Sequence, residues 1–145
     1  MPVHLVSAFV SKNQLVLGQL ATDCKSNEIT AIPKLLAMLE LAGATVTIDA
    51  MGWQRQIAGQ KADYILTVKE NQPTLYEKVK GLLDEAILEG FKGMPHGYFE
   101  QHDDGHGRIE KRRVWVSNDI VKWLGGELLN QWPGLASVAV VESTR

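Results

Sequence analysis

Short apolar and β-branched runs recur along the chain, separated by polar and glycine-containing turns. The runs Val3–Val10 and Gln14–Thr22 are rich in β-formers and lie either side of three polar residues, which predicts a β-hairpin. A helix is expected to begin within 26–31, to hold Pro33 in its first turn and to end at Gly43. Its apolar face is expected to contain Ile32, Leu35, Leu36 and Leu39.

The middle of the chain alternates between strand and helix patterns. Residues 44–50 are mostly apolar or β-branched, which predicts an interior strand covered on both faces. A short helical piece over 53–60 leads to a further strand over 62–69, and a strong amphipathic helix follows over 70–90 with Pro73 in its first turn. Strand, helix and strand in succession predict right-handed crossovers and an α/β sheet.

The last third predicts a hairpin over 97–117 that turns at 103–107, then a helix over 119–132 and a final strand over 135–143. No repeat, low-complexity tract or linker interrupts this order. We therefore expect residues 1–145 to form a single domain.

Composition narrows the class of protein. The 145 residues are 45% hydrophobic and 22% charged, which is typical of a soluble globular domain. With 15 basic and 17 acidic residues the net charge is -2, so overall charge points to neither a nucleic-acid nor a membrane partner. The single cysteine, Cys24, excludes an internal disulfide. Without a signal-peptide pattern or a long apolar run at its N-terminus, the chain is expected in the cytoplasm.

Asp49 is the first candidate for chemistry, because it ends the β-branched run and is followed by small residues and Gly52. In parallel α/β sheets, functional groups gather just beyond the carboxyl ends of the strands. Position alone leaves two readings open, a turn or cap aspartate and a functional carboxylate.

Several blocks, in order, favour the functional reading. They are "HLVSAF", "VLGQ", "KSNEITAIPKLL", "VTIDAMG", "ADYILTVKENQP" and "GHGRIEKR". Together they resemble bacterial insertion-sequence transposases of the DDE type, in the group of the H-repeat-associated proteins. The resemblance implies a ribonuclease-H-like mixed sheet flanked by helices, and an Asp, Asp, Glu triad holding two Mg²⁺ (or Mn²⁺) ions for phosphodiester hydrolysis and strand transfer. In this resemblance Asp49 matches the second aspartate.

The sequence also departs from that family. The first aspartate is expected on a strand ahead of "HLVSAF", and the glutamate beyond "VVESTR". Glu110 is the substitute candidate for the glutamate, although its surroundings predict a hairpin residue. The chain thus resembles a piece of a transposase core without its first core strand, and we expect little or no strand transfer from it alone.

The missing strand leads to an expectation about assembly. Its loss would expose strand edges, so we expect a homo-oligomer or domain swap, or a rearranged sheet whose final strand fills the gap. The alternative function is a non-catalytic remnant that binds DNA or itself.

Two groups are candidates for binding double-stranded DNA at transposon ends. Lys69, Asn71 and Gln72 follow a predicted strand, where Asn71 could equally lead a helix cap. The second group is the one concentrated basic patch, with a solvated strand as its alternative. It contains Arg108, Lys111, Arg112 and Arg113.

Two further sets of residues are assigned structural roles. His102, Asp103, Asp104 and His106 have metal-ligand chemistry, but their spacing matches no strong template and the flanking glycines favour a polar hairpin turn. The four tryptophans are predicted to be packing anchors, because no basic groove interleaves with them in the sequence. They are Trp53, Trp115, Trp123 and Trp132.

Overall fold

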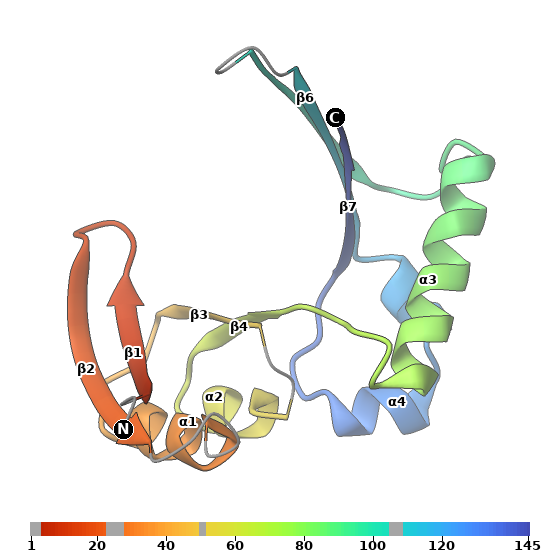
Figure 1. Cartoon of the computed structure of the whole chain (residues 1–145). Coiled ribbons are helices and arrows are strands. Elements are labelled where there is room, and N and C mark those ends of the chain that lie inside the picture. The colour runs from red at the N-terminus through yellow and green to blue at the C-terminus, as the bar shows by residue number, and fades with distance from the viewer. Residues whose placement is uncertain (1–3, 23–27, 50–51, 105–108) are drawn as a thin grey trace. The chain divides into compact units, whose positions relative to one another are not determined.

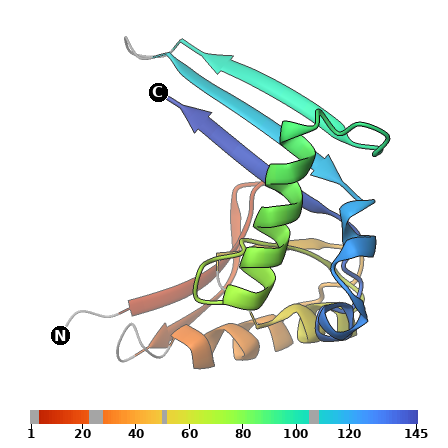
Figure 2. The same ribbon diagram turned by 90° about the vertical axis from the view of Figure 1, so that its right-hand side faces the viewer.

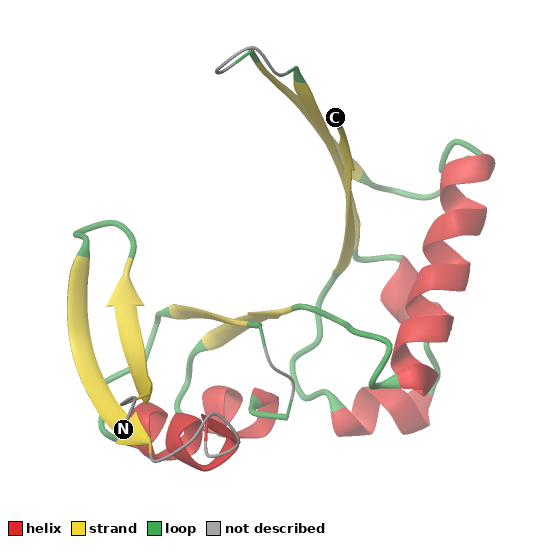
Figure 3. Cartoon of the chain, viewed as in Figure 1, coloured by secondary structure: helices red, strands yellow, loops and turns green. Residues whose placement is uncertain are grey.

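The computed structural model describes residues 4–22, 28–49, 52–104 and 109–145. The chain divides into two compact units, residues 1–67 and 68–145. Helices and both parallel and antiparallel strands occur, so the mixed α/β class is confirmed (Figures 1 and 3). We describe each unit by itself, and whether the two act as the single domain expected from the sequence stays a prediction.

The first unit opens with the predicted hairpin. Strands β1 (His4–Val10) and β2 (Leu15–Thr22) pair antiparallel, with a register shift between Ala8 and Phe9. Helix α1 packs on this hairpin, and a Cβ added at Gly18 would lie 3.1 Å from Leu35 Cδ1. Glycine at this position thus allows the helix to approach β2 closely.

Helix α1 (Glu28–Ala37) differs from its prediction at two points. Pro33 lies in its second turn, not in its first, and its carbonyl accepts a hydrogen bond from Gln56 Nε2 at 2.8 Å. The helix ends at Ala37, well before Gly43, and Gln60 Nε2 donates to the carbonyls of Leu36 at 3.0 Å and Leu39 at 3.3 Å. A distant side chain therefore satisfies carbonyls at this helix end, which local sequence could not predict.

A parallel strand pair completes the first unit. Strand β3 (Thr45–Ile48), helix α2 (Gln54–Gly59) and strand β4 (Asp63–Leu66) form the predicted strand, helix, strand unit. The expectation that both faces of β3 are covered is wrong, because Thr45 and Thr47 are exposed. One face alone packs on the helices, where Val46, Ile48 and Tyr64 contact the buried cluster Leu36, Leu41, Ile57 and Ala62.

The strands of the first unit form two separate two-stranded sheets, β1-β2 and β3-β4, among the residues described. The chain therefore does not return to the same sheet after α1, which corrects the first predicted crossover. Because isolated two-stranded sheets are marginal in water, these pairs depend on the helices beneath them. Helix α1 touches both, through Leu35 near Gly18 and through Leu36 in the buried cluster.

In the second unit, helix α3 (Pro73–Leu88) begins at Pro73 as predicted. Proline is suited to this first helical position because its missing N–H would have no partner there. The predicted amphipathic pattern is confirmed, because Leu75, Val79, Leu83 and Ala86 are buried and Leu82 is half-buried. Gly90 follows the helix with φ of 62°, a left-handed conformation that glycine adopts readily.

Strands β5 (Gly97–Asp103), β6 (Glu110–Ser117) and β7 (Val138–Thr144) form an antiparallel sheet in that order. The predicted hairpin is confirmed, but β7 pairs with β6, so the predicted rearrangement in which it fills a gap elsewhere is wrong. Helix α3 packs beside β7 on one sheet face (Figure 2). Val138 and its partner Ser117 are buried there, whereas Val141 on the opposite face is exposed.

The helix predicted over 119–132 is two short elements, a 3-10 helix η3 (Ile120–Trp123) and helix α4 (Gly126–Gln131). Gly125, with φ of 88°, breaks the helical path between them. Lys78 Nζ from α3 donates to the carbonyl of Leu124 at 3.1 Å and so satisfies the end of η3. No described helix is long and apolar enough to cross a membrane.

Candidate functional site

Asp49 directly follows β3, at the end where the two parallel strands of the first unit finish together. Ile48 pairs with Leu66, so the carboxyl ends of β3 and β4 lie side by side. Ile48 is half-buried against the buried cluster, while Asp49 is exposed. The end of β3 thus holds a carboxylate at the sheet edge where α/β proteins place functional groups.

Glu110, the substitute triad candidate, lies in the second unit as the first residue of β6. Its hairpin setting is the one predicted, since it pairs with Asp103 across β5 and β6. Glu110 Oε1 accepts from Arg112 at 3.2 Å, and Arg145 Nε lies 3.8 Å from the same oxygen. A metal ion at Glu110 Oε1 would therefore compete with the Arg112 and Arg145 guanidinium groups.

A two-ion site needs several hard oxygen ligands close together. Asp49 offers one, and within 4–22, 28–49, 52–104 and 109–145 no group of three or more His, Cys, Asp or Glu side chains is placed to hold a metal ion. The described residues do not by themselves fit the two-ion centre that the family resemblance implies.

The DNA-binding candidates Lys69, Asn71 and Gln72 precede α3 in the second unit. Lys69 and Asn71 are exposed, and the N–H of Gln72 donates to the carbonyl of Lys69 at 3.0 Å in a tight turn. Gln72, not Asn71, is the N-cap residue, and its side chain makes no capping hydrogen bond. The alternative that Asn71 leads a helix cap is therefore wrong.

The other DNA-binding candidates lie on β6, except Arg108, which falls outside the described residues. Lys111 pairs with Glu100 at 3.1 Å and Arg113 with Glu142 at 2.5 Å, both on the sheet face that α3 partly covers. Arg112 points to the opposite face and pairs with Glu110 at 3.2 Å. Each described cation of the basic patch thus has an acidic partner, which a DNA phosphate would have to replace.

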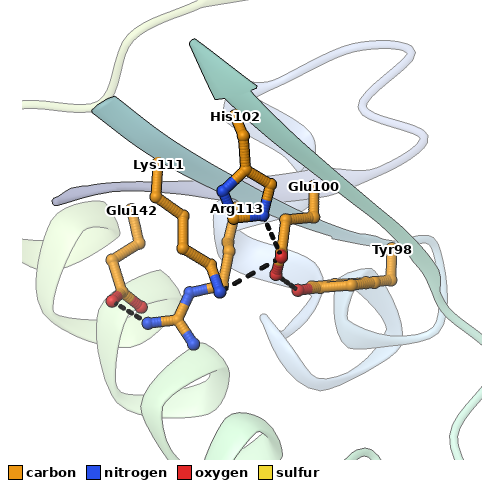
Figure 4. A network of polar contacts seen from close by, with 6 residues as sticks. All are labelled: Tyr98, Glu100, His102, Lys111, Arg113 and Glu142. Atoms are coloured by element: carbon orange, nitrogen blue, oxygen red, sulfur yellow. Dashed lines mark hydrogen bonds and ion pairs between the residues drawn. The ribbon is translucent and has the colours of Figure 1, made fainter. Parts of the chain in front are cut away.

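Glu100 is the centre of a polar network that the sequence did not reveal (Figure 4). It accepts a hydrogen bond from the Tyr98 hydroxyl, and its Oε1 lies 2.7 Å from His102 Nε2 and 3.1 Å from Lys111 Nζ. The hydrogen bond from Tyr98, followed by those from His102 and Lys111, lowers the pKa of Glu100 to about 2. The same hydrogen bond raises the pKa of the Tyr98 hydroxyl, so Tyr98 stays protonated.

Aromatic and basic side chains interleave on this face, contrary to the sequence-based expectation. Arg113 Cζ lies 5.6 Å from the centre of the Trp115 ring, and Tyr98 and Trp115 are tilted rings 5.3 Å apart. Trp132 is buried as predicted, but Trp123 is 65% exposed and is not a packing anchor. The alternation of Tyr98, Glu100 and His102 was the available signal, because alternate strand residues share a face.

At the β5–β6 turn the sequence left two alternatives, a set of metal ligands and a polar hairpin turn. His106 lies outside the described residues, and His102 is engaged with Glu100 rather than with a metal-ligand set. The antiparallel pairing of β5 with β6 confirms the hairpin. Residues 26 and 27, at the start of the range in which the first helix is expected to begin, also lie outside the described residues.

Comparisons with known proteins identify the family. Residues 1–124 match the model of the transposase DDE domain. The chain is 40% identical to "Uncharacterized protein in dhlA 3'region" of Xanthobacter autotrophicus, over 99% of this chain and 48% of that protein. It is 37% identical to "H repeat-associated putative transposase YhhI" of Escherichia coli K12, over 99% of this chain and 38% of that protein.

A third relative agrees. "Putative transposase YncI" of Escherichia coli O157:H7 is 42% identical over 99% of this chain and 36% of its own length. The chain thus spans between about a third and a half of these relatives. No solved structure matches it. The match to the DDE-domain model and the similarity to an H repeat-associated putative transposase establish that this chain belongs to the DDE-domain transposases of insertion sequences.

Proposed function

We propose that this chain is a segment of a ribonuclease-H-like transposase core in which Asp49 is the second aspartate of the triad. The supporting observation is the place of Asp49, exposed directly beyond β3 where the parallel strands β3 and β4 finish together. Such a carboxylate is held by the sheet without being covered by it. In that role Asp49 would help to hold a divalent ion, which would supply Lewis-acid chemistry for phosphodiester hydrolysis and strand transfer.

The contribution proposed for this chain is one carboxylate, that of Asp49. The described residues offer no three-ligand set, and we propose that other segments of the transposase supply the further acids. We therefore keep phosphodiester hydrolysis and strand transfer as activities of the complete transposase and expect little or none from this chain alone.

The proposed partner is double-stranded DNA. Lys69, Asn71 and Gln72 are the first contacts we propose, because they occupy a turn with two exposed side chains. Lys111, Arg112 and Arg113, with Arg108, come second, since the described three are held by Glu100, Glu110 and Glu142.

A second candidate function, a non-catalytic module that binds DNA or itself, is supported by two observations. Glu110 is held by arginines, so the substitute triad acid is already engaged. Strand β1 pairs only with β2, and β3 only with β4, within the part of the chain that the structure describes. Strand edges of this kind are templates for pairing with another chain, which supports the homo-oligomer expectation.

The experiment that tests the first proposal couples metal to DNA. Mg²⁺ in nucleotide-processing sites is held by one or two carboxylates together with phosphate oxygens. We therefore expect added Mg²⁺ to strengthen binding of a short transposon-end duplex, measured by fluorescence anisotropy at constant ionic strength. Asp49→Ala should abolish this strengthening while leaving metal-free DNA binding unchanged.

The matched control is Asp63→Ala. Asp63 is an exposed aspartate at the opposite end of the same strand pair, so its removal changes net charge equally. A loss of the Mg²⁺ effect in both variants would assign it to general charge and not to a site. Mg²⁺-independent DNA binding in the unmodified chain would favour the non-catalytic module.

A further inference from the structure

The sheet of the second unit has an apolar face on the side opposite the Glu100 network. Cross-strand register places six uncharged residues there in two adjacent rows. Phe99 and Val141 are 60% and 62% exposed, and Val116 is 38% exposed. We call the six residues the apolar sheet face: Gly97, Phe99, Val114, Val116, Ala139 and Val141.

The face carries both a projection and a hollow. An open hollow of about 330 Å³ lies where β5 begins. It is lined by Gly97 and Val116, which are paired across β5 and β6, and by neighbouring residues. The neighbours are Pro95, His96, Asn118 and Ser137. Gly97 has no side chain, and Val116 Cγ1 lies 2.9 Å from where a Cβ would stand there, so the Val116 side chain forms part of the floor. Phe99, two residues further along β5, projects from the same face beside this hollow.

The charge pattern argues for an apolar partner. The two rows of the apolar sheet face contain no charged residue, and the hollow is lined by glycine, proline, histidine and uncharged side chains. Charge begins only in the next row, with Arg112, which is paired to Glu110. A nucleic acid would find no free cation in these rows, whereas an exposed apolar patch with a polar rim is typical of a protein contact.

From this arrangement we infer that the apolar sheet face binds a second copy of this chain, with Phe99 of each copy in the hollow of the other. Gly97 and Phe99 lie about 7 Å apart along one face of β5, since a strand rises about 3.4 Å per residue. A two-fold axis that runs parallel to the sheet plane and crosses the strands midway between these two residues brings the two apolar sheet faces together and places each Phe99 over the partner's Gly97.

Such a contact is isologous and closes on itself. The same axis sends the charged tip of each hairpin, with Arg112 and Glu110, away from the partner's apolar rows. Like charges are therefore not brought together at the centre. This surface differs from the strand edges of the first unit and does not depend on the transposase chemistry.

Sedimentation equilibrium of the purified full chain tests the inference. We expect a reversible dimer for the unmodified chain. Phe99→Asp removes the projecting ring and places a charge in an apolar hollow, so it should weaken dimerisation about tenfold or more. Ser137→Trp adds a large side chain at a residue that lines the hollow and leaves Phe99 itself unchanged, so it should weaken dimerisation similarly. Both positions are exposed, and circular dichroism verifies that each variant is folded.

Leu88→Asp is the matched control, because Leu88 is 88% exposed at the end of α3 and outside the apolar sheet face. It should leave the dimer intact. Mixing a Phe99→Cys chain with a Ser137→Cys chain, both carrying Cys24→Ser, should give a disulfide-linked heterodimer on mild oxidation. A monomer at every concentration, or a dimer that survives Phe99→Asp, overturns the inference.

Discussion

The two units of this protein differ in the size of their sheets and in how their charged side chains are placed. The first, residues 1–67, has two sheets of two strands each, and its conspicuous acid, Asp49, is exposed at a strand end. The second, residues 68–145, has one three-stranded sheet whose charged side chains are paired with one another. The difference teaches that a charged run in the sequence is not by itself a binding surface.

The basic patch on β6 illustrates this. In the sequence, Lys111, Arg112 and Arg113 stand together, but alternate strand residues point to opposite faces. Glu100 on β5 and Glu142 on β7 then lie beside Lys111 and Arg113 through the strand register. Exposed pairs of this kind add little stability, but they lower the charge available to a phosphate backbone.

The largest predicted effect is the loss of stability when a buried core residue of either unit is replaced. Ile57 in the first and Ile120 in the second are each fully buried. Replacing either with alanine leaves a cavity and should cost about 2–5 kcal/mol of unfolding free energy. Hydrogen exchange followed by mass spectrometry should show that Ile57→Ala lowers protection within 4–67 and Ile120→Ala within 68–145.

The two substitutions serve as controls for each other. They remove the same atoms from equally buried positions, so a difference in where protection falls reports the boundary between cooperative units. An equal loss across the whole chain in both variants would mean that residues 1–145 unfold as one unit and would contradict the division.

A smaller effect is expected from acid, and only in the second unit. Hydrogen bonds from Tyr98, His102 and Lys111 lower the pKa of Glu100 from 4.5 to about 2. A lowered folded-state pKa stabilises the fold above the ordinary value, and this stabilisation is lost as pH falls from about 4.5 towards 2. Glu100→Gln should weaken this pH dependence without altering the first unit.

Carbon-detected NMR of the Glu100 carboxyl measures this directly. Titration near pH 2 agrees with the network, and titration near 4.5 contradicts it. Asp84→Asn is the control, because it removes a carboxylate that lies on α3 and outside the sheet. There Asp84 accepts a hydrogen bond from exposed Lys80 and raises the pKa of Lys80, so the variant should leave the titration of Glu100 unchanged.

Local patterns predicted the hairpins and α3 well, because strand alternation and the position of Pro73 act over a few residues. They failed where a distant group decides the outcome. Gln60 satisfies the carbonyls at the end of α1, and Gly125 takes a left-handed conformation that splits the predicted helix over 119–132. The exposed face of β3 also could not be predicted, since it follows from a sheet with only two strands.

At the candidate site, too, some features could be predicted from local sequence and others could not. The strand-end position of Asp49 followed from the pattern of residues 44–52, and its matching to a triad acid came from the family resemblance. The Glu100 network required the register of β5 with β6, which sets Glu100 opposite Arg113 and His102 opposite Lys111. The number of residues between β5 and β6 does not by itself say which residues of the two strands are paired.

The most direct test of Asp49 as a metal-binding carboxylate is paramagnetic broadening of amide NMR signals by Mn²⁺, with transposon-end duplex present. We predict broadening centred on Ile48, Asp49 and Leu66, abolished by Asp49→Asn and retained in Asp63→Asn. Broadening centred on Glu100, Glu110 or Glu142 in the β5-β6-β7 sheet, or broadening unchanged by Asp49→Asn, would contradict the assignment.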